Sequence, residues 1–546
     1  MDYPFKNRFA FLVIVFSLLA FFIRWYHLGE ISLWLDEALT GIVVNSTDWL
    51  SSLQSENTPV VYYFLQRALC QLMICDESGL RLLSAISGSA FIAVIMIAVR
   101  LQTDTWTALL AGVFVLISPI HIYYSQEARV YSLLLLETAG FYLLQWKIIK
   151  GEARKSHWIL FGSLAVLMLH THYFSILILG SSFLVVLSST LLTLRSVSPW
   201  YFLIIVGSGI TLLPWMLVSV FGEHSSYNDL SWIQPIWDNE HSVRLFASTV
   251  QVYLAGPARP DNILALKQYR DIIMPGYFYP LSMGLVLLFT VLFLRVALLK
   301  SKTRDLDIQS LVESAAQFAL PLVALFAISY AIRPVYVVGR YDVIAYPAFL
   351  IFLAHIIRVI TSDKVKNNKL DVYLACTFVV ATLVAQGAVA TRYFSDWPKK
   401  DHQATSDDIS SLMTNGSSLV FVGRSSAVNL YYFLLSGYSK AENHCIHNTG
   451  TVINCFIFPE EFDKAPGSTA RYDRMISQSF DSYEIEYILT ELQGNNFWLH
   501  INQMANTGSN YAMDEVSYKL VNNLKSRGFV IQKAYPDLQL LKLARL

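Results

Sequence analysis

The chain has 546 residues, of which 54% are hydrophobic and only 15% are charged, and its mean hydropathy is +0.45. Soluble domains carry about 25% charged residues, so this composition excludes an ordinary soluble protein. The formal net charge is zero, so charge alone indicates no class of partner, and we expect no nucleic acid among the partners.

Apolar runs long enough to cross a hydrocarbon core of about 30 Å recur along most of the chain. They predict a polytopic α-helical membrane protein with about 11–13 transmembrane helices. The first run lacks a small-residue cleavage site and is interpreted as a retained span. The expected spans are residues 9–27, 81–99, 105–121, 130–146, 157–170, 173–194, 200–220, 279–299, 317–331, 343–360 and 371–391.

The distribution of Lys and Arg sets the expected orientation. Cytoplasmic loops carry an excess of these residues, and they are frequent at the N-terminus and in the loops 147–155, 295–304 and 363–369. We therefore expect a multi-pass membrane protein with a cytoplasmic N-terminus. The segments that could carry chemistry then face outward, namely residues 28–80, 125–129, 170–173, 221–278, 333–341 and the tail after 392.

The composition changes near residue 400, where short β-rich runs begin to alternate with helical ones. That alternation predicts a small α/β domain. We expect a transmembrane module over residues 1–395, which includes the outward loop 28–80, and an extracytoplasmic α/β domain over 396–546.

The five cysteines show no metal-ligand spacing. Cys445 and Cys455 lie in the expected outward domain, where a disulfide could form. Cys70 and Cys75 are five residues apart on a predicted helix, so we expect that they do not face each other.

The stretch "LWLDEALT" places Asp36 and Glu37 side by side after the first span. Acidic residues at this position can cap a helix and interact with its positive end. Alternatively, a partly desolvated carboxylate can act as a general base toward an attacking hydroxyl. The two interpretations can hold for different members of the pair.

The stretch "ENTPVVYYFLQRAL" in the same loop predicts an amphipathic helix along the membrane surface. Pro59 is expected as its first residue. Tyr62 and Tyr63 give the helix an interfacial character, and Gln66 and Arg67 interrupt its apolar run.

The stretch "SQEAR" contains Gln126, Glu127 and Arg129 at the mouth of the fourth span. Glu127 and Arg129 are two residues apart and would not face each other on a helix, so each is expected to have another partner. A substrate contact and an interfacial polar cap are both open.

The stretch "HTHYF" contains His170, His172 and Tyr173 at the end of the fifth span. Two such histidines could ligate a metal together with a carboxylate. They could instead hydrogen-bond a sugar or phosphate, or simply lie at the membrane interface.

The stretch "RPVYVVGRYDVIAYP" places Arg333 and Arg340 on the outer side, against the Lys/Arg bias. Arginine binds phosphate through two parallel hydrogen bonds and stays charged, and Gly339 allows a close backbone approach. A phosphate site and a structural ion pair are equally compatible with this spacing.

Together the motifs indicate an outward site with carboxylates, arginines, histidines and tyrosines at the membrane surface. Such a set suits transfer of a sugar from a polyprenyl-phosphate donor. One carboxylate would deprotonate the acceptor hydroxyl, and arginines or a divalent cation would stabilise the departing phosphate. No cofactor is certain, and a divalent cation is one option.

In this order the motifs resemble the bacterial branch of the GT-C membrane glycosyltransferases, which includes protein O-mannosyltransferases and the lipid A aminoarabinose transferase. The resemblance covers about residues 10–350. It implies an inverting enzyme that transfers one sugar from polyprenyl phosphate to a hydroxyl of a glycolipid, polysaccharide or protein. Membrane lipids, the lipid-linked donor and that acceptor are the expected partners.

The resemblance also implies roles for individual residues. Asp36 matches the catalytic base, and Glu37 matches a neighbour that shapes the site or holds a cation. The role that the resemblance implies for His172 and Tyr173 is less settled. The residues that match positions near the donor and its phosphate are Gln126, Glu127, Arg129, His172, Tyr173, Arg340 and Tyr341.

One stretch departs from the family pattern. Aminoarabinose transferases have a Lys in a "HKPPLYY"-like sequence, whereas this chain reads "NTPVVYY", with Asn57, Thr58 and Val60 in that region. The departure argues against a strict lipid A aminoarabinose transferase and leaves phosphate stabilisation to Arg129, Arg340 or a metal.

Two other classes of function are compatible with the sequence. A carrier or flippase of lipid-linked sugars would place polar groups near the bilayer midplane, where Glu137 is the most obvious candidate. A catalytically degenerate sugar-binding membrane protein is the other alternative.

Overall fold

The computed structural model divides into two compact units by its internal contacts. The membrane unit comprises Met1–Gly29, Leu53–Met73 and Ser78–Pro398, and the sheet unit comprises Glu30–Ser52, Ile74–Glu77 and Lys399–Leu546. The structure describes residues 3–46, 49, 59–73, 75–193, 197–221, 233, 237, 244–257, 274–299, 306–361, 369–395, 402–422, 426–435, 438–441, 444–447, 452–458, 496–501, 504–506, 511–513, 515–535 and 540–545.

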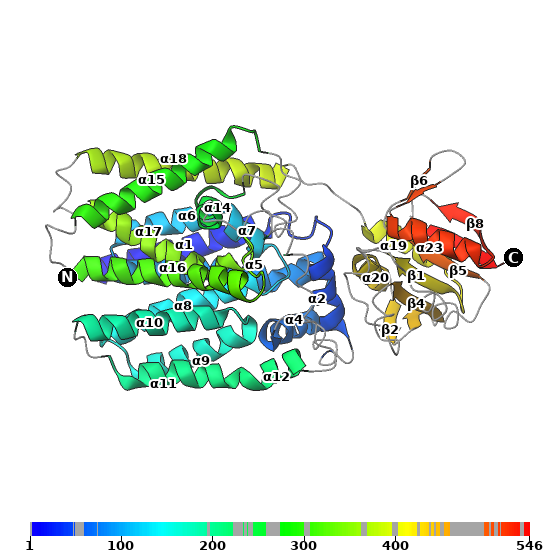
Figure 1. The fold of residues 1–546 in the computed structure, drawn as a ribbon, viewed down its shortest axis with the longest axis horizontal. Helices are drawn as coiled ribbons and strands as arrows, with labels where there is room; N and C mark the ends of the chain where they lie inside the picture. Colours follow the sequence, from blue (N-terminus) through cyan, green and yellow to red (C-terminus); the bar gives the residue numbers. More distant parts are fainter. Residues whose placement is uncertain are drawn as a thin grey trace. The chain divides into compact units, whose positions relative to one another are not determined.

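Long helices that run alongside one another build the membrane unit (Figure 1). In chain order they are α1 (Tyr3–Trp25), α4 (Val60–Leu72), α5 (Glu77–Gln102), α6 (Thr105–Leu116), α7 (Pro119–Ser125), α8 (Tyr131–Ile149), α9 (Lys155–Thr171), α10 (Ser175–Thr193), α11 (Pro199–Thr211), α12 (Leu213–Phe221), α14 (Arg244–Ala255), α15 (Phe278–Leu299), α16 (Leu306–Ala331), η6 (Asp342–Ala345), α17 (Tyr346–Thr361) and α18 (Lys369–Ser395).

The predicted membrane protein is confirmed, and each expected span coincides with one of these helices or with a broken pair. Among the described residues, 8 helices are long and apolar enough to cross a membrane, or 9 if the pair α6 and α7 counts as one span. The helices α8 and α9 match two further expected spans without meeting that measure. With 17 residues, α9 is short for a core of about 30 Å, and polar residues interrupt α8.

The third expected span is bent by 62° between α6 and α7. Pro119 begins α7, and its ring and missing N–H cannot continue the preceding helix. The fully buried Arg24 accounts for the freed carbonyls, because its guanidinium donates to the oxygens of Val115 (3.0 Å) and Leu116 (3.3 Å). It also donates to Nδ1 of His121 at 2.8 Å, so it joins both sides of the bend.

The helix α16 extends further than the expected span 317–331, because it begins at residue 306. The expected span stopped short of the polar residues near the start of this helix. One of them, Glu313, accepts hydrogen bonds from Ser189 (2.7 Å) and Gln309 (2.8 Å). A charged residue with partners on neighbouring turns and helices can extend a membrane helix toward the interface.

The span formed by η6 and α17 is the central helix of the membrane unit. Of the residues in this span, 89% are buried inside the protein, compared with 22% of those in the span of α1. The turn "VGRYD" leads directly into this helix, so the residues of that turn are attached to the most buried candidate span among the described residues.

The predicted amphipathic helix of the first loop is α4, and it starts one residue later than expected. Pro59 is the residue before the helix rather than its first residue, with φ −68° and ψ 170°. Tyr62, Tyr63 and Gln66 are buried in the membrane unit, whereas Phe64 is 59% exposed.

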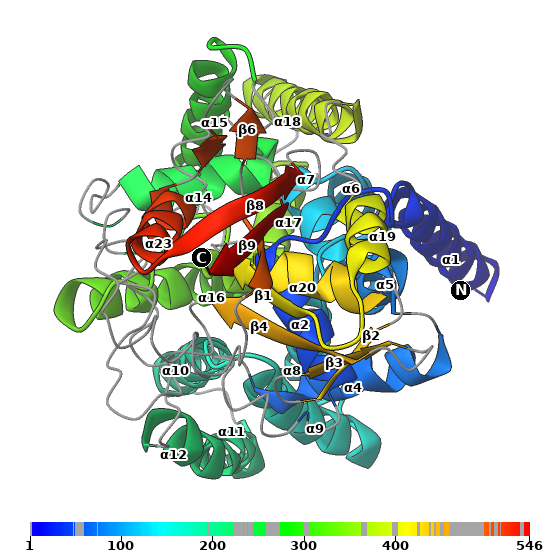
Figure 2. The same ribbon diagram turned by 90° about the vertical axis from the view of Figure 1, so that its right-hand side faces the viewer.

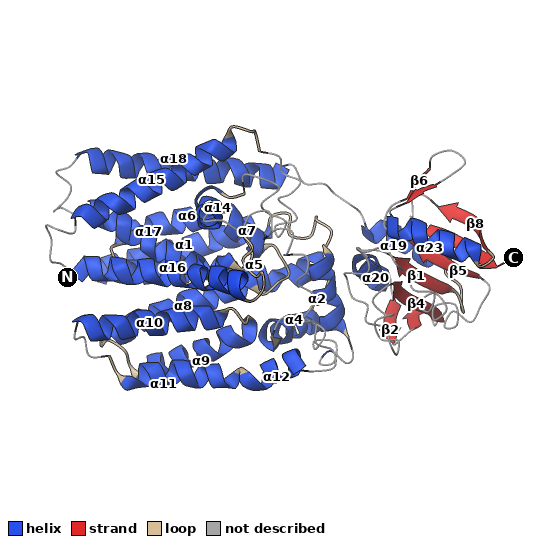
Figure 3. Cartoon of the chain, in the orientation of Figure 1, coloured by secondary structure: helices blue, strands red, loops and turns tan. Residues whose placement is uncertain are grey.

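The sheet unit confirms the predicted α/β fold, and all described strands lie in it (Figure 3). Its main sheet has the order β2-β3-β4-β1-β5-β9-β8. The central strands β4, β1 and β5 are parallel, and the outer neighbours are antiparallel. The strands are β1 (Ser418–Val422), β2 (Tyr438–Ala441), β3 (His444–His447), β4 (Val452–Phe458), β5 (Asn496–His500), β8 (Phe529–Tyr535) and β9 (Leu540–Arg545), with a separate pair β6 (Met504–Asn506) and β7 (Tyr511–Met513).

The described helices of the sheet unit are α2 (Leu35–Asn45), α19 (His402–Leu412), α20 (Ser426–Leu435) and α23 (Glu515–Ser526) (Figure 2). The core between α19, α20 and the sheet includes Ile409, Phe421 and Phe433. The helix α2 packs on α20, and its Ile42 contacts this core. The part of the first loop that contains the paired acids therefore clusters with the C-terminal part of the chain.

The two cysteines of the first loop are oxidised. The expectation for Cys70 and Cys75 assumed one helix through both, but α4 ends at Leu72, so Cys75 lies beyond it. Both cysteines are disulfide-bonded. The premise of that expectation was wrong because the helix ends early. The side chains of Cys445 and Cys455, like residues Asn57 and Thr58, lie outside the described part of the chain.

Candidate active site

The turn before the central helix positions Arg340. Gly339 has φ +76°, a conformation that glycine adopts without strain, and its carbonyl accepts a hydrogen bond from the hydroxyl of Tyr124. The Nε of Arg340 donates to the hydroxyl of Tyr131 at 3.0 Å. The guanidinium also lies 5.5 Å from the ring centroid of Tyr341. Arg340 and Tyr341 are only partly buried, so they can meet a ligand.

His172 directly follows the last residue of α9 and lies between aromatic rings. Its ring centroid is 5.8 Å from that of Tyr131 and 6.0 Å from that of Tyr341. The Nδ1 atom accepts the N–H of Phe174 at 3.1 Å, which an imidazolium cannot do because both of its nitrogens carry protons. Burial, assisted by Arg129 and Arg340, lowers the pKa of His172 to about 3. The ring is therefore neutral, with its proton on Nε2.

Arg129 joins α4 to this region. Its guanidinium is buried and donates to the hydroxyl of Tyr63 at 3.2 Å. Arg129 and Arg340 both lower the pKa of His172. Tyr131 links two of these residues directly, because its hydroxyl accepts the hydrogen bond from Arg340 and its ring centroid lies 5.8 Å from that of His172. We call the resulting group the arginine–tyrosine cluster; its members are Tyr63, Tyr124, Arg129, Tyr131, His172, Arg340 and Tyr341.

The side chains of Gln126 and Glu127 have different partners in the membrane unit. The Nε2 of Gln126 donates to the carbonyls of Arg24 (2.9 Å) and Tyr26 (2.8 Å), which ties the end of α1 to the "SQEAR" segment. Oε1 of Glu127 accepts a hydrogen bond from the hydroxyl of Tyr123 at 3.3 Å. Gln126 thus has a structural contact, whereas Glu127 is a buried carboxylate next to the segment that holds Arg129.

Tyr173 points to a different neighbour from His172. Its hydroxyl accepts a hydrogen bond from Nε1 of Trp215 at 2.6 Å, so it links the end of α9 to α12. His170 faces Thr211 of α11, with Nε2 and Oγ1 at 3.3 Å. Of the three residues singled out in this motif, His172 lies in the arginine–tyrosine cluster, and the ring of the neighbouring Phe174 packs on Tyr341 at 5.1 Å between centroids.

The paired acids of the first loop have different environments in the sheet unit. Glu37 is fully buried, and its carboxylate accepts the N–H of Trp34 at 3.3 Å, which is half of a capping box at the start of α2. Asp36 is partly exposed in the same first turn. The capping interpretation thus applies to Glu37, and Asp36 has the exposure that a group in contact with substrate requires.

Several residues of this region were not singled out from the sequence. Tyr124 and Tyr131 flank the "SQEAR" motif. A tyrosine hydroxyl close in sequence to Arg129 was the signal that could have identified them. Asp342 directly follows Tyr341 and is fully buried; its carboxylate accepts a hydrogen bond from Thr249 at 2.6 Å. Thr249 also pairs with Tyr336 at 2.8 Å, so this network braces the arginine turn against α14.

Glu137, the residue that suggested transport, has a local partner. Its Oε1 accepts a hydrogen bond from the hydroxyl of Thr171 at 3.1 Å. Thr171 is the last residue of α9 and directly precedes His172. Glu137 therefore contributes to how α8 and α9 pack beside the arginine–tyrosine cluster.

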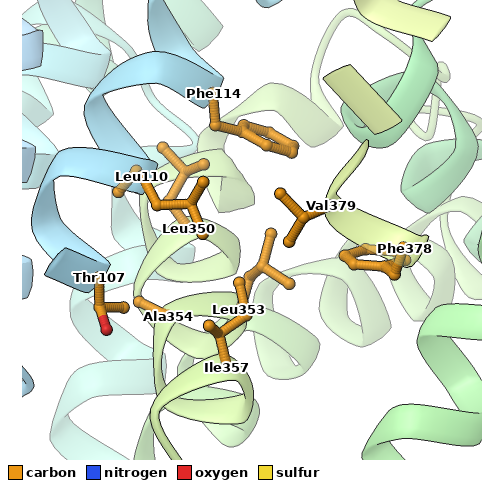
Figure 4. A pocket seen from close by; sticks show the side chains of 10 residues that line it. Thr107, Leu110, Phe114, Leu350, Leu353, Ala354, Ile357, Phe378 and Val379 are labelled. Carbon is orange, nitrogen blue, oxygen red and sulfur yellow. The ribbon is translucent and has the colours of Figure 1, made fainter. Parts of the chain in front are cut away.

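An apolar pocket lies between α6, α17 and α18 of the membrane unit (Figure 4). No titratable side chain lines it, so the pocket offers hydrocarbon contacts and no acid, base or phosphate ligand. Its lining residues are Thr107, Leu110, Ala111, Phe114, Leu350, Leu353, Ala354, Ile357, Phe378 and Val379.

Metal ligands are not grouped in the described part of the chain, where no cluster of three or more His, Cys, Asp or Glu side chains occurs. His170 and His172 point to different partners, so the described residues offer no histidine pair for a cation. Arginines are the groups in this region that could neutralise a phosphate.

Comparisons with known proteins agree with these features. A family model described as dolichyl-phosphate-mannose-protein mannosyltransferase matches residues 57–217, a range that contains the "SQEAR" and "HTHYF" motifs. No curated protein matches the sequence of the chain.

Crystal structures of ArnT from Cupriavidus metallidurans are similar to the whole chain. The form bound to undecaprenyl phosphate has 13% sequence identity and a TM-score of 0.56, and the apo form has 14% identity and a TM-score of 0.57. Each alignment covers 98% of this chain and 98% of the other. The apo oligosaccharyltransferase of Archaeoglobus fulgidus matches at 11% identity and a TM-score of 0.49, over 91% of this chain and 70% of that one.

At such identities a structural similarity establishes the fold and not the substrate. The expected fold, a bundle of membrane helices with a C-terminal α/β unit, is the one that ArnT shares over nearly the full length of both chains. Together with the family match over residues 57–217, this shared fold makes the chain similar to the GT-C membrane glycosyltransferases, among them protein O-mannosyltransferases and ArnT.

Proposed function

We propose that the chain is an inverting glycosyltransferase that moves a single sugar from a polyprenyl-phosphate donor to an acceptor hydroxyl. The reaction would take place at the outer face of a prokaryotic cytoplasmic membrane, with a glycolipid, a polysaccharide or a protein as acceptor. The observation that supports it best is that Tyr131 holds Arg340 beside His172, while Tyr63 holds the buried Arg129.

Two guanidiniums held near one imidazole are well suited to a phosphate group. Arginine presents several N–H donors in a fixed plane, and charge-assisted hydrogen bonds to phosphate are strong. The tyrosines Tyr63 and Tyr131 each use a hydroxyl to orient one guanidinium. The neutral His172 adds an Nε2–H donor without further positive charge. Such preorganised donors stabilise the negative charge that develops on a departing phosphate.

Asp36 is our candidate for the general base. It would take the proton of the acceptor hydroxyl while that oxygen attacks the sugar carbon and the bond to the phosphate oxygen breaks. A single displacement of this kind inverts the configuration of the sugar. Glu37, whose carboxylate caps α2, would keep the first turn of this helix in place. A divalent cation beside the phosphate is compatible with the chemistry but is not required by the described side chains.

The disulfide-bonded state of Cys70 and Cys75 supports the outward orientation of the first loop. Disulfides persist in oxidising compartments such as the periplasm and are rare in the cytosol. A polyprenyl-phosphate sugar displayed at the outer face would meet the loop that contains Asp36 on that side.

The test compares lipid-linked sugars and envelope glycans, by mass spectrometry, in cells with the wild-type gene, a deletion, or Asp36→Asn. We expect one polyprenyl-phosphate sugar to accumulate in both the deletion and the variant, while one glycan loses a residue. The donor and the acceptor are then identified together. Asp407→Asn, an exchange of an exposed aspartate on α19, is the matched control and should behave as wild type.

Two results would contradict the proposal. If Asp36→Asn protein reaches the membrane at the wild-type level and restores the glycan fully, Asp36 is not the base. If the deletion changes neither the lipid-linked pool nor any glycan, the transferase assignment itself fails. Counterflow of a labelled lipid-linked sugar without product would then indicate a carrier.

A further inference from the structure

The C-terminal part of the chain contacts the first-loop segment through two adjacent tyrosines of α20. Tyr431 and Tyr432 are buried within the sheet unit. The hydroxyl of Tyr432 accepts the N–H of Leu33 at 2.9 Å and donates to Oε1 of Glu77 at 2.7 Å. The hydroxyl of Tyr431 donates to the carbonyl of Cys75. One helix therefore contacts both first-loop segments of this unit, Glu30–Ser52 and Ile74–Glu77.

The contact with Leu33 lies immediately before the helix that contains Asp36. Leu33 precedes Trp34, which is the N-cap of α2, and the N–H of Trp34 is bonded by Glu37. Two successive backbone amides are thus fixed, one by Tyr432 and one by Glu37. The direction in which the chain enters α2 decides where the side chain of Asp36, in the first turn, is placed.

Packing along α2 adds to this contact. A Cβ atom on Gly41 would lie 2.4 Å from the ring of Tyr431, so the helix approaches α20 as closely as a glycine permits. Ile42 contacts the core of the sheet unit. With only 11 residues, α2 is shorter than the roughly 12–15 residues below which isolated helices are marginal in water. Its order therefore depends on tertiary packing, and α20 supplies that packing.

We propose that the C-terminal α/β part of the chain positions the catalytic acid of the first loop, and that Tyr432 is the positioning residue that transmits this order. The proposal rests on the proposed function, since it takes Asp36 as the base. It gives the α/β part a role in the transfer step itself, separate from any recognition of the acceptor. Tyr432 would act only through the backbone of Leu33 and α2, without contact with the substrates.

The test uses the full-length protein in lipid nanodiscs and the same genes in deletion cells. Tyr432→Phe removes only the hydroxyl and keeps the ring in place. Hydrogen exchange followed by mass spectrometry reports on the amides of residues 33–38, and glycan analysis reports on transfer. Tyr535→Phe makes the same chemical change on β8 of the same unit and is the matched control.

We expect Tyr432→Phe to accelerate exchange at residues 33–38 about tenfold, because a hydrogen bond worth about 1.4 kcal/mol is lost. Transfer should fall about tenfold or more, because a displaced catalytic group misses its near-attack geometry. Tyr535→Phe should match wild type in both measurements. Glu77→Gln, which keeps an oxygen acceptor for the Tyr432 hydroxyl, should retain most of the transfer, whereas Glu77→Ala should lose it.

The outcomes separate this inference from the proposed function. Wild-type exchange at residues 33–38 in Tyr432→Phe would overturn the positioning contact. Suppose that Tyr432→Phe shows faster exchange at these residues but unchanged transfer, while Asp36→Asn abolishes transfer. The role of Tyr432 in transfer would then be overturned, and Asp36 would remain the proposed base. Full transfer by Asp36→Asn would overturn the base and the inference with it. If Tyr432→Phe protein does not accumulate in cells, the variants Glu77→Gln and Glu77→Ala provide the test instead. Equal transfer activity of these two variants would contradict the inference.

Discussion

The Nε of Arg340 donates to the hydroxyl of Tyr131 across 3.0 Å, and 209 positions of sequence separate the two residues. This hydrogen bond joins the turn before the central helix to the segment that follows "SQEAR". Because Nε of Arg340 is engaged in this bond, Tyr131 orients the guanidinium. The "SQEAR" region and the turn that contains Arg340 are therefore joined in the folded chain.

We predict that Tyr131→Phe lowers sugar transfer about tenfold while the protein still folds. The loss removes one hydrogen bond, worth about 1 kcal/mol, that orients Arg340. Glycan analysis in deletion cells measures transfer, and the thermal midpoint of the purified protein measures folding. Tyr373→Phe, which alters a tyrosine that is 68% exposed on α18, is the control and should leave both unchanged. Full transfer by Tyr131→Phe would show that Arg340 needs no such orientation.

A second prediction concerns the guanidinium itself. Arg340→Lys should reduce transfer nearly as much as Arg340→Ala, because a lysine provides a point charge and cannot form two parallel hydrogen bonds to phosphate. We expect losses of about a hundredfold for both variants, since removal of a single preorganised donor from a charged transition state costs roughly that factor. If Lys preserves transfer while Ala abolishes it, charge alone suffices at this position.

The pH dependence of stability tests the environment of His172. Its pKa is about 3 in the folded protein and about 6.5 when unfolded, so the unfolded chain binds the proton more readily between these values. The stability that this histidine contributes is therefore complete above about pH 6.5 and is lost as the pH falls toward 3. At pH 5 the loss amounts to about 2 kcal/mol.

His172→Asn removes this titration and keeps an oxygen that can accept the N–H of Phe174. We expect the midpoint of unfolding to fall less for the variant than for wild type between pH 7 and pH 5, as measured by thermal scans in nanodiscs. Parallel curves for the two proteins would show that His172 is protonated in the folded state and that the Nδ1 contact is not maintained.

We expect the two acids of the first loop to have different roles, with Asp36 catalytic and Glu37 structural. Glu37→Ala removes half of a capping box, so we expect it to destabilise α2 by about 1 kcal/mol and to speed amide exchange in the first turn. Asp36→Asn should leave exchange and the thermal midpoint near wild type while transfer is lost. If Asp36→Asn instead disorders the first turn and Glu37→Ala does not, the roles of the two residues are reversed.

Much of the fold was predictable from the sequence because membrane spans depend on simple hydropathy. The broken span at Pro119 was missed for a physical reason: Arg24 satisfies the carbonyls that the break exposes, and it lies about a hundred positions away. The same limit applies to the arginine–tyrosine cluster. Motif order predicted Arg129, His172 and Arg340, but hydroxyl partners such as Tyr63 and Tyr131 become visible only when distant helices are brought together.

The contact of α2 with α20 could not be predicted at all, since 30–52 and 399–546 are separated by the whole membrane unit in sequence. Hydropathy gives no signal for a short helix that packs on a distant one. The sequence contained a single local hint, a glycine inside the predicted helical stretch "LTGIVV". Glycine in a helix interior costs about 1 kcal/mol relative to alanine, and at Gly41 the close approach of Tyr431 accounts for it.

That glycine leads to the last prediction. Gly41→Ala adds a Cβ 2.4 Å from the ring of Tyr431, and because that ring is buried it cannot move aside freely. Although alanine favours the helix intrinsically, we expect a net loss of about 1–3 kcal/mol from overpacking. Hydrogen exchange of α2 in the full chain measures the effect. Gly180→Ala, at a helical position with no heavy atom within 4 Å of the new Cβ, should be neutral or slightly stabilising. Slower exchange in Gly41→Ala would mean that α2 is not held against α20, because only then could helix propensity outweigh the steric cost.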